Sequence, residues 1–229
     1  MEITAEKLAA YIDHTLLKAT ATSEDIKRLC AEAKEYDFCA VSINNRWISL
    51  AADILADSKV KVGSVVSLPL GADATQIKVA SARQAIMDGA DEIDMVADLA
   101  AIIEGDENYL RKQLAAVLDV CRAMKPAVPL KVIIESAALT REQKIFACQV
   151  ADRCRVDFVK TSTGINPAGG ATVEDVKLMK EHAPNCKIKA AGGIRTATQA
   201  IDMLEAGAER IGTSYGVQII EQLKSGQLQ

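Results

Sequence analysis

Two lysines stand in short β-branched segments where a buried strand would normally have apolar residues. Lys160 lies near the end of residues 157–161, and Lys189 lies within residues 187–191. If adjacent strands hold the two ammonium groups about 5–6 Å apart, repulsion lowers one pKa by about 2 units, and burial lowers it further. A lysine that is neutral at about pH 7 can attack a carbonyl carbon and form a Schiff base.

Carboxylates occur in segments of the same kind. Glu92 and Asp94 alternate along residues 92–96, and Glu135 ends residues 130–135. Asp94 is the acid best placed to exchange protons with the lysine that stays charged. Alternatively, the two lysines belong to a structural ion-pair network with these carboxylates, because buried charges require partners. The residue types alone leave both interpretations open.

Glycine-rich stretches follow the last two of the strand-like segments, and a stretch of hydroxyl side chains and glycine follows Lys160. Glycine lets backbone N–H groups approach an anion closely, and the loops after strands seven and eight form the usual phosphate site of barrel enzymes. Alternatively, the paired glycines only form a tight turn from strand to helix. The candidate anion-binding residues are Gly192, Gly193, Arg195, Gly212 and Ser214.

The composition argues against several classes of function. The 229 residues include 27 basic and 31 acidic side chains, with a formal net charge of −4 and no basic block that would indicate nucleic-acid binding. No apolar run is long enough to span a membrane, and the N-terminus lacks a signal-peptide pattern, so we expect a cytoplasmic protein. Two histidines and six scattered cysteines form no metal-ligand cluster and no disulfide framework.

Strand-like and helix-like segments alternate along the chain. The strand-like segments are residues 12–15, 38–43, 60–68, 92–96, 130–135, 157–161, 187–191 and 210–213. Strict alternation implies a parallel sheet, and eight units imply closure into a (β/α)8 TIM barrel. We expect residues 1–229 to form a single barrel domain with a short N-terminal helix. An open doubly wound sheet is the alternative, but no Gly-x-Gly-x-x-Gly motif follows an early strand.

The predicted helices have recognisable first turns. In a capping box, a side-chain oxygen accepts from the third helical N–H while an acid or amide reaches back. Five pairs fit this pattern or a close relative of it: Thr22 with Asp25, Asp73 with Gln76, Thr140 with Gln143, Thr172 with Asp175, and Thr196 with Gln199. Their recurrence after strand-like segments supports the barrel prediction.

The motifs around the candidate residues form a family pattern. They are Ile12-Asp-His-Thr-Leu-Leu-Lys18, Glu92-Ile-Asp-Met-Val96, Lys131-Val-Ile-Ile-Glu135, Asp157-Phe-Val-Lys-Thr-Ser-Thr-Gly164 and Lys189-Ala-Ala-Gly-Gly-Ile-Arg195. Together they resemble the deoxyribose-phosphate aldolases, over nearly the whole chain. The resemblance implies a metal-independent class I aldolase without a cofactor. Such an enzyme reversibly cleaves 2-deoxy-D-ribose 5-phosphate to D-glyceraldehyde 3-phosphate and acetaldehyde.

The resemblance also implies roles for individual residues. Lys160 matches the Schiff-base lysine, and Lys189 matches a second lysine that perturbs it and shares in proton transfer. Asp94 matches an acid/base aspartate, and Asp13 matches an aspartate of the proton relay. The matches around the substrate and its phosphate are Thr163, Gly164, Gly192, Gly193, Gly212 and Ser214. The partners would be a phosphorylated sugar and acetaldehyde, with no nucleic acid and no membrane, and the chain could pair as a homodimer.

Several positions depart from the common family pattern. Ser42 stands where a cysteine is common, so we expect unusual tolerance of reactive aldehydes, which modify thiols. Ile165 stands where some members have a lysine near the phosphate, and Tyr215 replaces a serine there. Residues 226–229 lack a tyrosine that some members use in proton transfer, which leaves the aspartate, the second lysine and water for that step.

Two other functions remain open from the sequence. A Schiff-base aldolase of another sugar phosphate would share Lys160 and the phosphate loops. A catalytically silent barrel that binds sugar phosphates is the alternative from another class. The presence of Lys160, Lys189 and Asp94 argues against it, because a pure binding protein has no use for a lysine with a depressed pKa.

Overall fold

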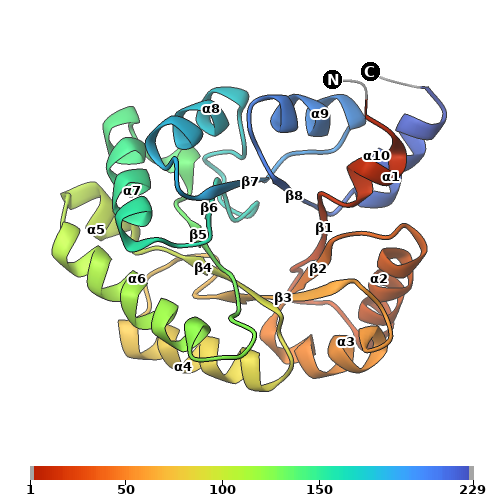
Figure 1. Cartoon of the computed structure of the whole chain (residues 1–229), viewed down its shortest axis with the longest axis horizontal. Helices are drawn as coiled ribbons and strands as arrows, with labels where there is room; N and C mark the ends of the chain where they lie inside the picture. The colour runs from red at the N-terminus through yellow and green to blue at the C-terminus, as the bar shows by residue number, and fades with distance from the viewer. Residues whose placement is uncertain (1–2, 227–229) are drawn as a thin grey trace.

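Eight parallel strands close into a barrel in the computed structural model of the chain, which describes residues 3–226. Each strand pairs with the next along the sequence, and β8 pairs with β1 to close the barrel (Figure 1). The strands are β1 Ile12–Leu16, β2 Ala40–Ile43, β3 Lys61–Val66, β4 Glu92–Val96, β5 Leu130–Ile133, β6 Phe158–Lys160, β7 Lys187–Ala191 and β8 Arg210–Thr213. The predicted (β/α)8 TIM barrel is confirmed.

Helices surround the barrel on its outside (Figure 1). The predicted short N-terminal helix is α1, Ala5–Ala9, and it packs against α10. The remaining helices are α2 Ser23–Glu35, α3 Ile48–Leu55, α4 Thr75–Met87, α5 Leu99–Glu104, α6 Glu107–Arg122, α7 Arg141–Cys154, α8 Val173–His182, α9 Ala197–Glu205 and α10 Gly216–Lys224, with 3-10 turns η1 Asn45–Trp47 and η2 Ser136–Ala138. The extra helix α5, which follows β4, was not predicted.

The apolar core lies between the strands and the helices, because successive side chains of a strand point to opposite sides. On β4, Ile93 and Met95 are fully buried and belong to this core. Glu92 and Asp94 point the opposite way, into the barrel interior. There they make ion pairs with basic side chains of β5, β6 and β8. On β3 the phase is the same but the residue types differ, because Val65, opposite Asp94, faces the interior.

The strand register aligns the charged residues inside the barrel. Lys160 on β6 is directly opposite Lys189 on β7, and Asp94 on β4 is directly opposite Lys131 on β5. Directly opposed residues of parallel strands point to the same side of the sheet. The register therefore brings charges from separate parts of the sequence into one layer of the barrel interior.

Helix capping follows the sequence at four of the five predicted sites. Thr22, Thr140 and Thr196 form complete capping boxes, and the Thr172 hydroxyl accepts from the third helical N–H of α8. The prediction for Asp73 was wrong. Helix α4 begins one residue later than that pattern requires, with Ala74 at the N-cap and no side-chain hydrogen bond there.

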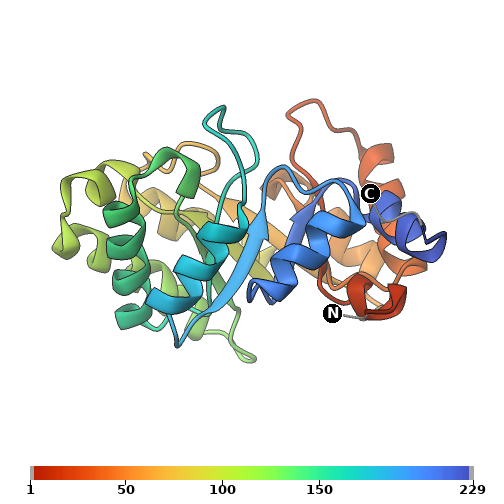
Figure 2. The ribbon, with the colours of Figure 1, turned by 90° about the horizontal axis from the view of Figure 1, so that it is seen from above.

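Several loops rise from the face of the barrel at which the strands end. Figure 2 shows the loop after β1, in red-orange, and the loop after β6, in teal, projecting on the same side of the barrel. This is the face where barrel enzymes have their active sites. Within residues 3–226, none of the helices combines the length and the apolar character needed to cross a membrane.

Candidate active site

A cavity of about 740 Å³ opens at the carboxyl ends of the strands. Eight of the residues proposed from the sequence for chemistry or phosphate binding line it: Lys160, Thr163, Gly164, Gly192, Gly193, Arg195, Gly212 and Ser214. Lys189, Asp94 and Asp13 do not line the cavity and are buried inside the barrel, each about 1% exposed. The structure therefore brings the predicted residues together in two layers, one open to a ligand and one beneath it.

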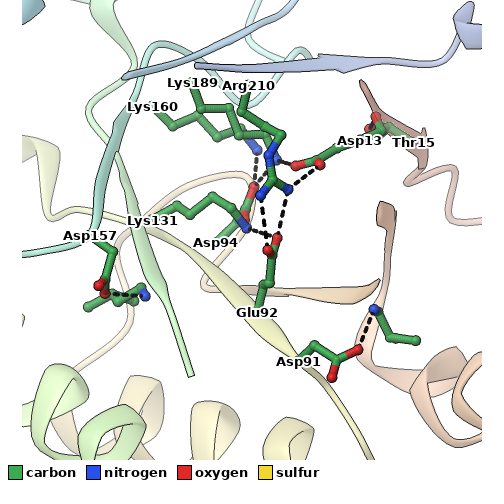
Figure 3. Close-up of polar contacts among 12 residues, drawn as sticks. Asp13, Thr15, Asp91, Glu92, Asp94, Lys131, Asp157, Lys160, Lys189 and Arg210 are labelled. Atoms are coloured by element: carbon green, nitrogen blue, oxygen red, sulfur yellow. Dashed lines mark hydrogen bonds and ion pairs between the residues drawn. The ribbon is translucent and has the colours of Figure 1, made fainter. Parts of the chain in front are cut away.

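Asp94 connects the two lysines (Figure 3). Lys160 Nζ and Lys189 Nζ each donate to the same carboxylate oxygen, Asp94 Oδ2, over 2.7 Å. A third lysine, Lys131, donates to the other oxygen, Oδ1, over 2.8 Å. The expected pairing of Lys160, Lys189 and Asp94 is present in the structure, and Lys131 holds the carboxylate from its other side.

Six side chains of alternating charge form a closed ring in the barrel interior, which we call the charge ring (Figure 3). In order, the ring consists of Asp94, Lys131, Glu92, Arg210, Asp13 and Lys189, which contacts Asp94 again. The Arg210 guanidinium donates to Asp13 Oδ1 over 2.6 Å and to both Glu92 oxygens over 3.0 and 3.1 Å. Lys160 lies outside the ring and contacts it only through Asp94.

The environment of Lys160 lowers the pKa of its ammonium group. Burial is the largest cause, and together with the charge of Lys189 it outweighs the attraction of Asp94, so that the pKa falls from 10.5 to about 8. From the sequence we expected repulsion between the two lysines to lower the pKa by about 2 units and burial to lower it further. Desolvation is larger because Lys160 is only 3% exposed and Asp94 compensates for the nearby positive charge.

The two aspartates beneath the cavity stay ionised. Burial alone would raise the pKa of Asp94, but the ammonium groups of Lys131, Lys160 and Lys189 hold it well below its ordinary value. Burial acts in the same way on Asp13, and the charges of Lys189 and Arg210 lower its pKa to about 2. Both carboxylates are therefore hydrogen-bond acceptors throughout the neutral pH range.

The two glycines of the loop after β7 differ in how much space a side chain would have at each position. A Cβ on Gly192 would lie 3.0 Å from Gly170 Cα, and the backbone there has a φ of 93°, so this residue allows two loops to pack closely. Gly193 also has a positive φ, 80°, but a Cβ there would meet nothing within 4 Å. The positive φ of both residues fits the tight-turn interpretation, and Gly193 in addition presents open backbone to the cavity.

Ser214 has a hydroxyl that is already hydrogen-bonded, whereas Gly212 makes room for a neighbouring side chain. The Ser214 hydroxyl donates to the Thr15 carbonyl over 2.7 Å, which joins the end of β8 to the end of β1. A Cβ on Gly212 would lie 2.9 Å from Ala191 Cβ and 3.2 Å from Lys189 Cε, so glycine here leaves room for the buried lysine. Ser214 must turn its hydroxyl away from Thr15 before it can donate to an anion.

Glu135 does not belong to the ion-pair network that the sequence offered as an alternative role for the two lysines. Its backbone is left-handed, with a φ of 54°, and its carboxylate accepts the Thr163 N–H over 3.1 Å. The fully buried side chain makes no ion pair among residues 3–226. Glu135 thus fixes the loop after β6 instead of compensating a lysine.

Two basic residues at the site were not assigned roles from the sequence. Lys18, in the loop after β1, is exposed and lines the cavity, and the family motif that ends with it was its only signal. Arg210 occupies the first position of β8 and belongs to the charge ring. Its phase could have revealed it, because Arg210 and Gly212 are two residues apart and point to the same side.

The departures from the family pattern occupy different environments. Ser42 is buried in β2, outside the cavity lining, and the aldehyde tolerance inferred from it stays a prediction. Ile165 and Tyr215 are 49% and 40% exposed and both line the cavity. Residues 227–229, where a terminal tyrosine was missing from the sequence, lie outside the described residues. Among residues 3–226, no three His, Cys, Asp or Glu side chains come together as metal ligands.

Comparison with known proteins gives the family. The model of the DeoC/LacD family aldolases matches residues 7–222. The chain belongs to this family. A deoxyribose-phosphate aldolase of Thermococcus gammatolerans is 52% identical over 93% of this chain and 95% of its own length, and one of Aciduliprofundum boonei is 52% identical over 96% and 98%. The chain is therefore a lyase of the aldolase type.

A solved structure agrees with this membership. The deoxyribose phosphate aldolase of Aeropyrum pernix, described as a unique tetramer, superimposes with a TM-score of 0.90 and 29% identity. The alignment covers 97% of this chain and 93% of that one. The family thus shares the barrel in which the cavity and the charge ring are built.

Proposed function

We propose that this chain is a class I aldolase that reversibly cleaves 2-deoxy-D-ribose 5-phosphate to D-glyceraldehyde 3-phosphate and acetaldehyde, with Lys160 as the Schiff-base residue. The main support is the position of Lys160, which lines the cavity, is almost fully buried and has a pKa of about 8. A neutral amine at the base of a cavity is the group that Schiff-base chemistry requires. The names of the relatives support the choice of substrate.

The charge of the cavity fits a phosphorylated substrate. Its lining includes the basic residues Lys18, Lys160 and Arg195 and, among the described residues, no acidic one. Lys18 and Arg195 are exposed near the mouth, on the loops after β1 and β7. A phosphate held between these loops, near the Gly193 backbone, would leave the sugar aldehyde free to reach Lys160 at the base.

The proposed reaction begins when neutral Lys160 attacks C1 of the open-chain aldehyde. Loss of water gives an iminium ion. A base then removes the proton of the C3 hydroxyl, the C2–C3 bond breaks, and its electron pair moves into the iminium group to give an enamine. Glyceraldehyde 3-phosphate leaves, the enamine takes up a proton at C2, and hydrolysis releases acetaldehyde and regenerates Lys160.

The buried layer supplies the proton transfers in this scheme. Lys189 and Lys160 donate to the same oxygen of Asp94, so a single carboxylate separates Lys189 from the reacting nitrogen of Lys160. Asp94 and Asp13 are ionised, so they orient the ammonium group of Lys189 and accept hydrogen bonds instead of storing a proton. In this scheme water takes up the C3 hydroxyl proton, and the Lys189 ammonium group donates a proton through water to C2 of the enamine and regains one from solvent.

Borohydride trapping tests this proposal. The protein is incubated with deoxyribose 5-phosphate and sodium borohydride, then analysed by intact mass and peptide mapping. We expect one reduced adduct on Lys160, release of glyceraldehyde 3-phosphate in the absence of borohydride, and neither signal from Lys160→Leu. An adduct on Lys189 would exchange the roles of the two lysines.

The same experiment separates the competing functions. A folded protein that binds the sugar phosphate without forming an adduct would be a silent barrel. An adduct with other sugar phosphates but not with deoxyribose 5-phosphate would identify an aldolase of different specificity. The Lys160→Leu variant, which retains the phosphate loops, is the control for binding without chemistry.

A further inference from the structure

The charge ring and Lys160 differ in their electrostatic balance. The ring has three cations, Lys131, Lys189 and Arg210, and three carboxylates, Asp13, Glu92 and Asp94. Each ring cation contacts two of these carboxylates. Lys160 contacts Asp94 alone, over 2.7 Å. With all groups ionised, the ring is neutral and Lys160 is the one excess charge of the network.

We propose that Arg210 and Glu92, which lie below the cavity and do not line it, set the protonation state of Lys160 through the net charge of the ring. This inference rests on the proposed role of Lys160 as the Schiff-base residue. It assigns a function in the reaction to two side chains that touch neither substrate nor the reacting nitrogen. They are positioning residues, because they act through Lys131, Asp13 and Asp94.

Because the network is buried, the charges of Arg210 and Glu92 can affect Lys160 although they do not contact it. Every member is at most 9% exposed, so water screens the charges weakly. At a separation of about 10 Å and an effective dielectric of about 20, one unit charge changes a pKa by roughly one unit. The contact between Arg210 and Glu92 closes the ring on the side away from Lys160.

No other polar group described near the charge ring compensates the charge of its members. The Cys39 thiol is close enough to interact with Arg210, but burial raises the pKa of this thiol, which keeps it neutral. Glu135 accepts the Thr163 N–H with one oxygen and makes no ion pair among residues 3–226, and the exposed Lys187 lies against the Phe158 ring, which Arg210 also contacts. Strands β2 and β3 add no buried charge among the described residues.

Two substitutions that break the same ion pair should act in opposite directions. Arg210→Gln removes a cation and leaves the ring with an excess negative charge, which stabilises the Lys160 ammonium group. Glu92→Gln removes a carboxylate and leaves an excess positive charge, which favours the neutral amine. A role limited to holding the barrel together predicts similar effects from both changes, because each removes one side of the same contact.

The experiment measures how readily Lys160 reacts as a function of pH. Wild type, Arg210→Gln, Glu92→Gln, the double variant and Arg210→Lys are incubated with acetaldehyde and sodium cyanoborohydride, and the Lys160 adduct is followed by mass spectrometry. Acetaldehyde is uncharged, so the substrate phosphate does not affect the profile. We expect the midpoint to rise by about one pH unit in Arg210→Gln and to fall by about one unit in Glu92→Gln.

The remaining variants are matched controls. Arg210→Lys keeps the charge, and the double variant restores the balance, so both midpoints should stay near that of wild type. Circular dichroism at each pH identifies variants that have unfolded. Should Arg210→Gln fail to fold, the direction of the shift in Glu92→Gln decides alone.

The possible outcomes separate this inference from the proposed function. Shifts in the same direction, or no shift in folded variants, would overturn the role of the charge ring while wild type still forms the Lys160 adduct. Absence of that adduct in wild type would overturn the proposed function itself.

Discussion

Lys160 and Lys189 have the same functional group and lie opposite each other on adjacent strands, yet their partners differ. Lys189 contacts both Asp13 and Asp94, whereas Lys160 contacts only Asp94. Burial lowers the pKa of Lys160, and its single carboxylate partner offsets only part of that effect. This difference in partners supports the proposal that Lys160 is the nucleophile.

The pKa of Lys160 predicts how activity depends on pH. Because this pKa is lowered to about 8, the amine is protonated below that value and becomes nucleophilic above it. At about pH 7 roughly a tenth of the molecules have the neutral amine, about 300 times the fraction of an unperturbed lysine. We expect kcat/KM to rise with pH up to about 8 and then to level off. A kcat/KM that does not change between about pH 6 and about pH 8 would contradict the lowered pKa of Lys160.

Removing Lys160 should abolish activity without weakening the fold. In Lys160→Leu the charge ring keeps all its ion pairs and a desolvated charge is lost, so we expect the free energy of unfolding to increase by about 1–3 kcal/mol. Lys131→Met is the matched contrast. It leaves Glu92 and Asp94 short of a cation and should cost about 3–5 kcal/mol. Urea denaturation of both variants tests this, and equal destabilisation would refute it.

Lys18 should contribute to recognition of the phosphate. Because it is exposed at the cavity wall, we expect Lys18→Met to raise KM for deoxyribose 5-phosphate about fivefold, with no effect on unphosphorylated deoxyribose. Lys27→Met is the control, since Lys27 is an exposed lysine of nearby α2 that pairs with Glu24. Steady-state kinetics with both sugars give the answer. Equal losses with the two sugars would exclude a phosphate contact.

At the level of elements, the capping pattern gives a paired prediction. Thr22 forms a capping box at α2, whereas Asp73 lies outside the start of α4. We therefore expect Thr22→Ala to lower the free energy of unfolding by about 1 kcal/mol and Asp73→Ala to leave it nearly unchanged. Thermal or chemical denaturation distinguishes them. A large loss in Asp73→Ala would show that the attraction between Asp73 and the buried Lys78, and not helix capping, is what this residue contributes.

Strand periodicity predicted the order of elements and, for β4, β7 and β8, their bounds. The prediction for β3 extended too far, to residue 68, because the apolar pattern continues past Val66 while Ser67 turns into the left-handed region. The Asp73 pattern also failed, since the chain between β3 and α4 has turn geometry that side-chain spacing does not encode. Periodicity reports burial, whereas the loop conformation decides where an element ends.

The site was predictable where a charge interrupts an apolar strand. Lys160, Lys189 and Asp94 stand out in this way, and the structure brings them into contact. Arg210 was missed because a basic residue at the start of a strand is ordinary, and Lys18 because loop residues have no periodicity. The closure of the ring depends on the pairing of β1 with β8, which places Asp13 beside Arg210 although 197 positions separate them.

For the whole molecule, the proposed chemistry predicts insensitivity to chelators. The iminium ion on Lys160 accepts the electron pair that a metal ion would otherwise stabilise. We therefore expect full activity after dialysis against excess EDTA, measured as release of glyceraldehyde 3-phosphate. Loss of activity that returns with added zinc would indicate a metal-dependent mechanism instead. The sequence left monomer and homodimer open, and light scattering in solution distinguishes the two.

The charge ring also bears on how this protein can change during evolution. Its six members balance one another, so replacing any one charged member by a neutral residue leaves the buried ring with one uncompensated charge, which a second substitution can restore to balance. Lys160 is different, because its loss leaves every member of the ring paired. Under the proposed role of Lys160, a single substitution would separate a working aldolase from a stable barrel that keeps the phosphate loops. Lineages that retain the ring would then lose the reaction, or regain it, in one step.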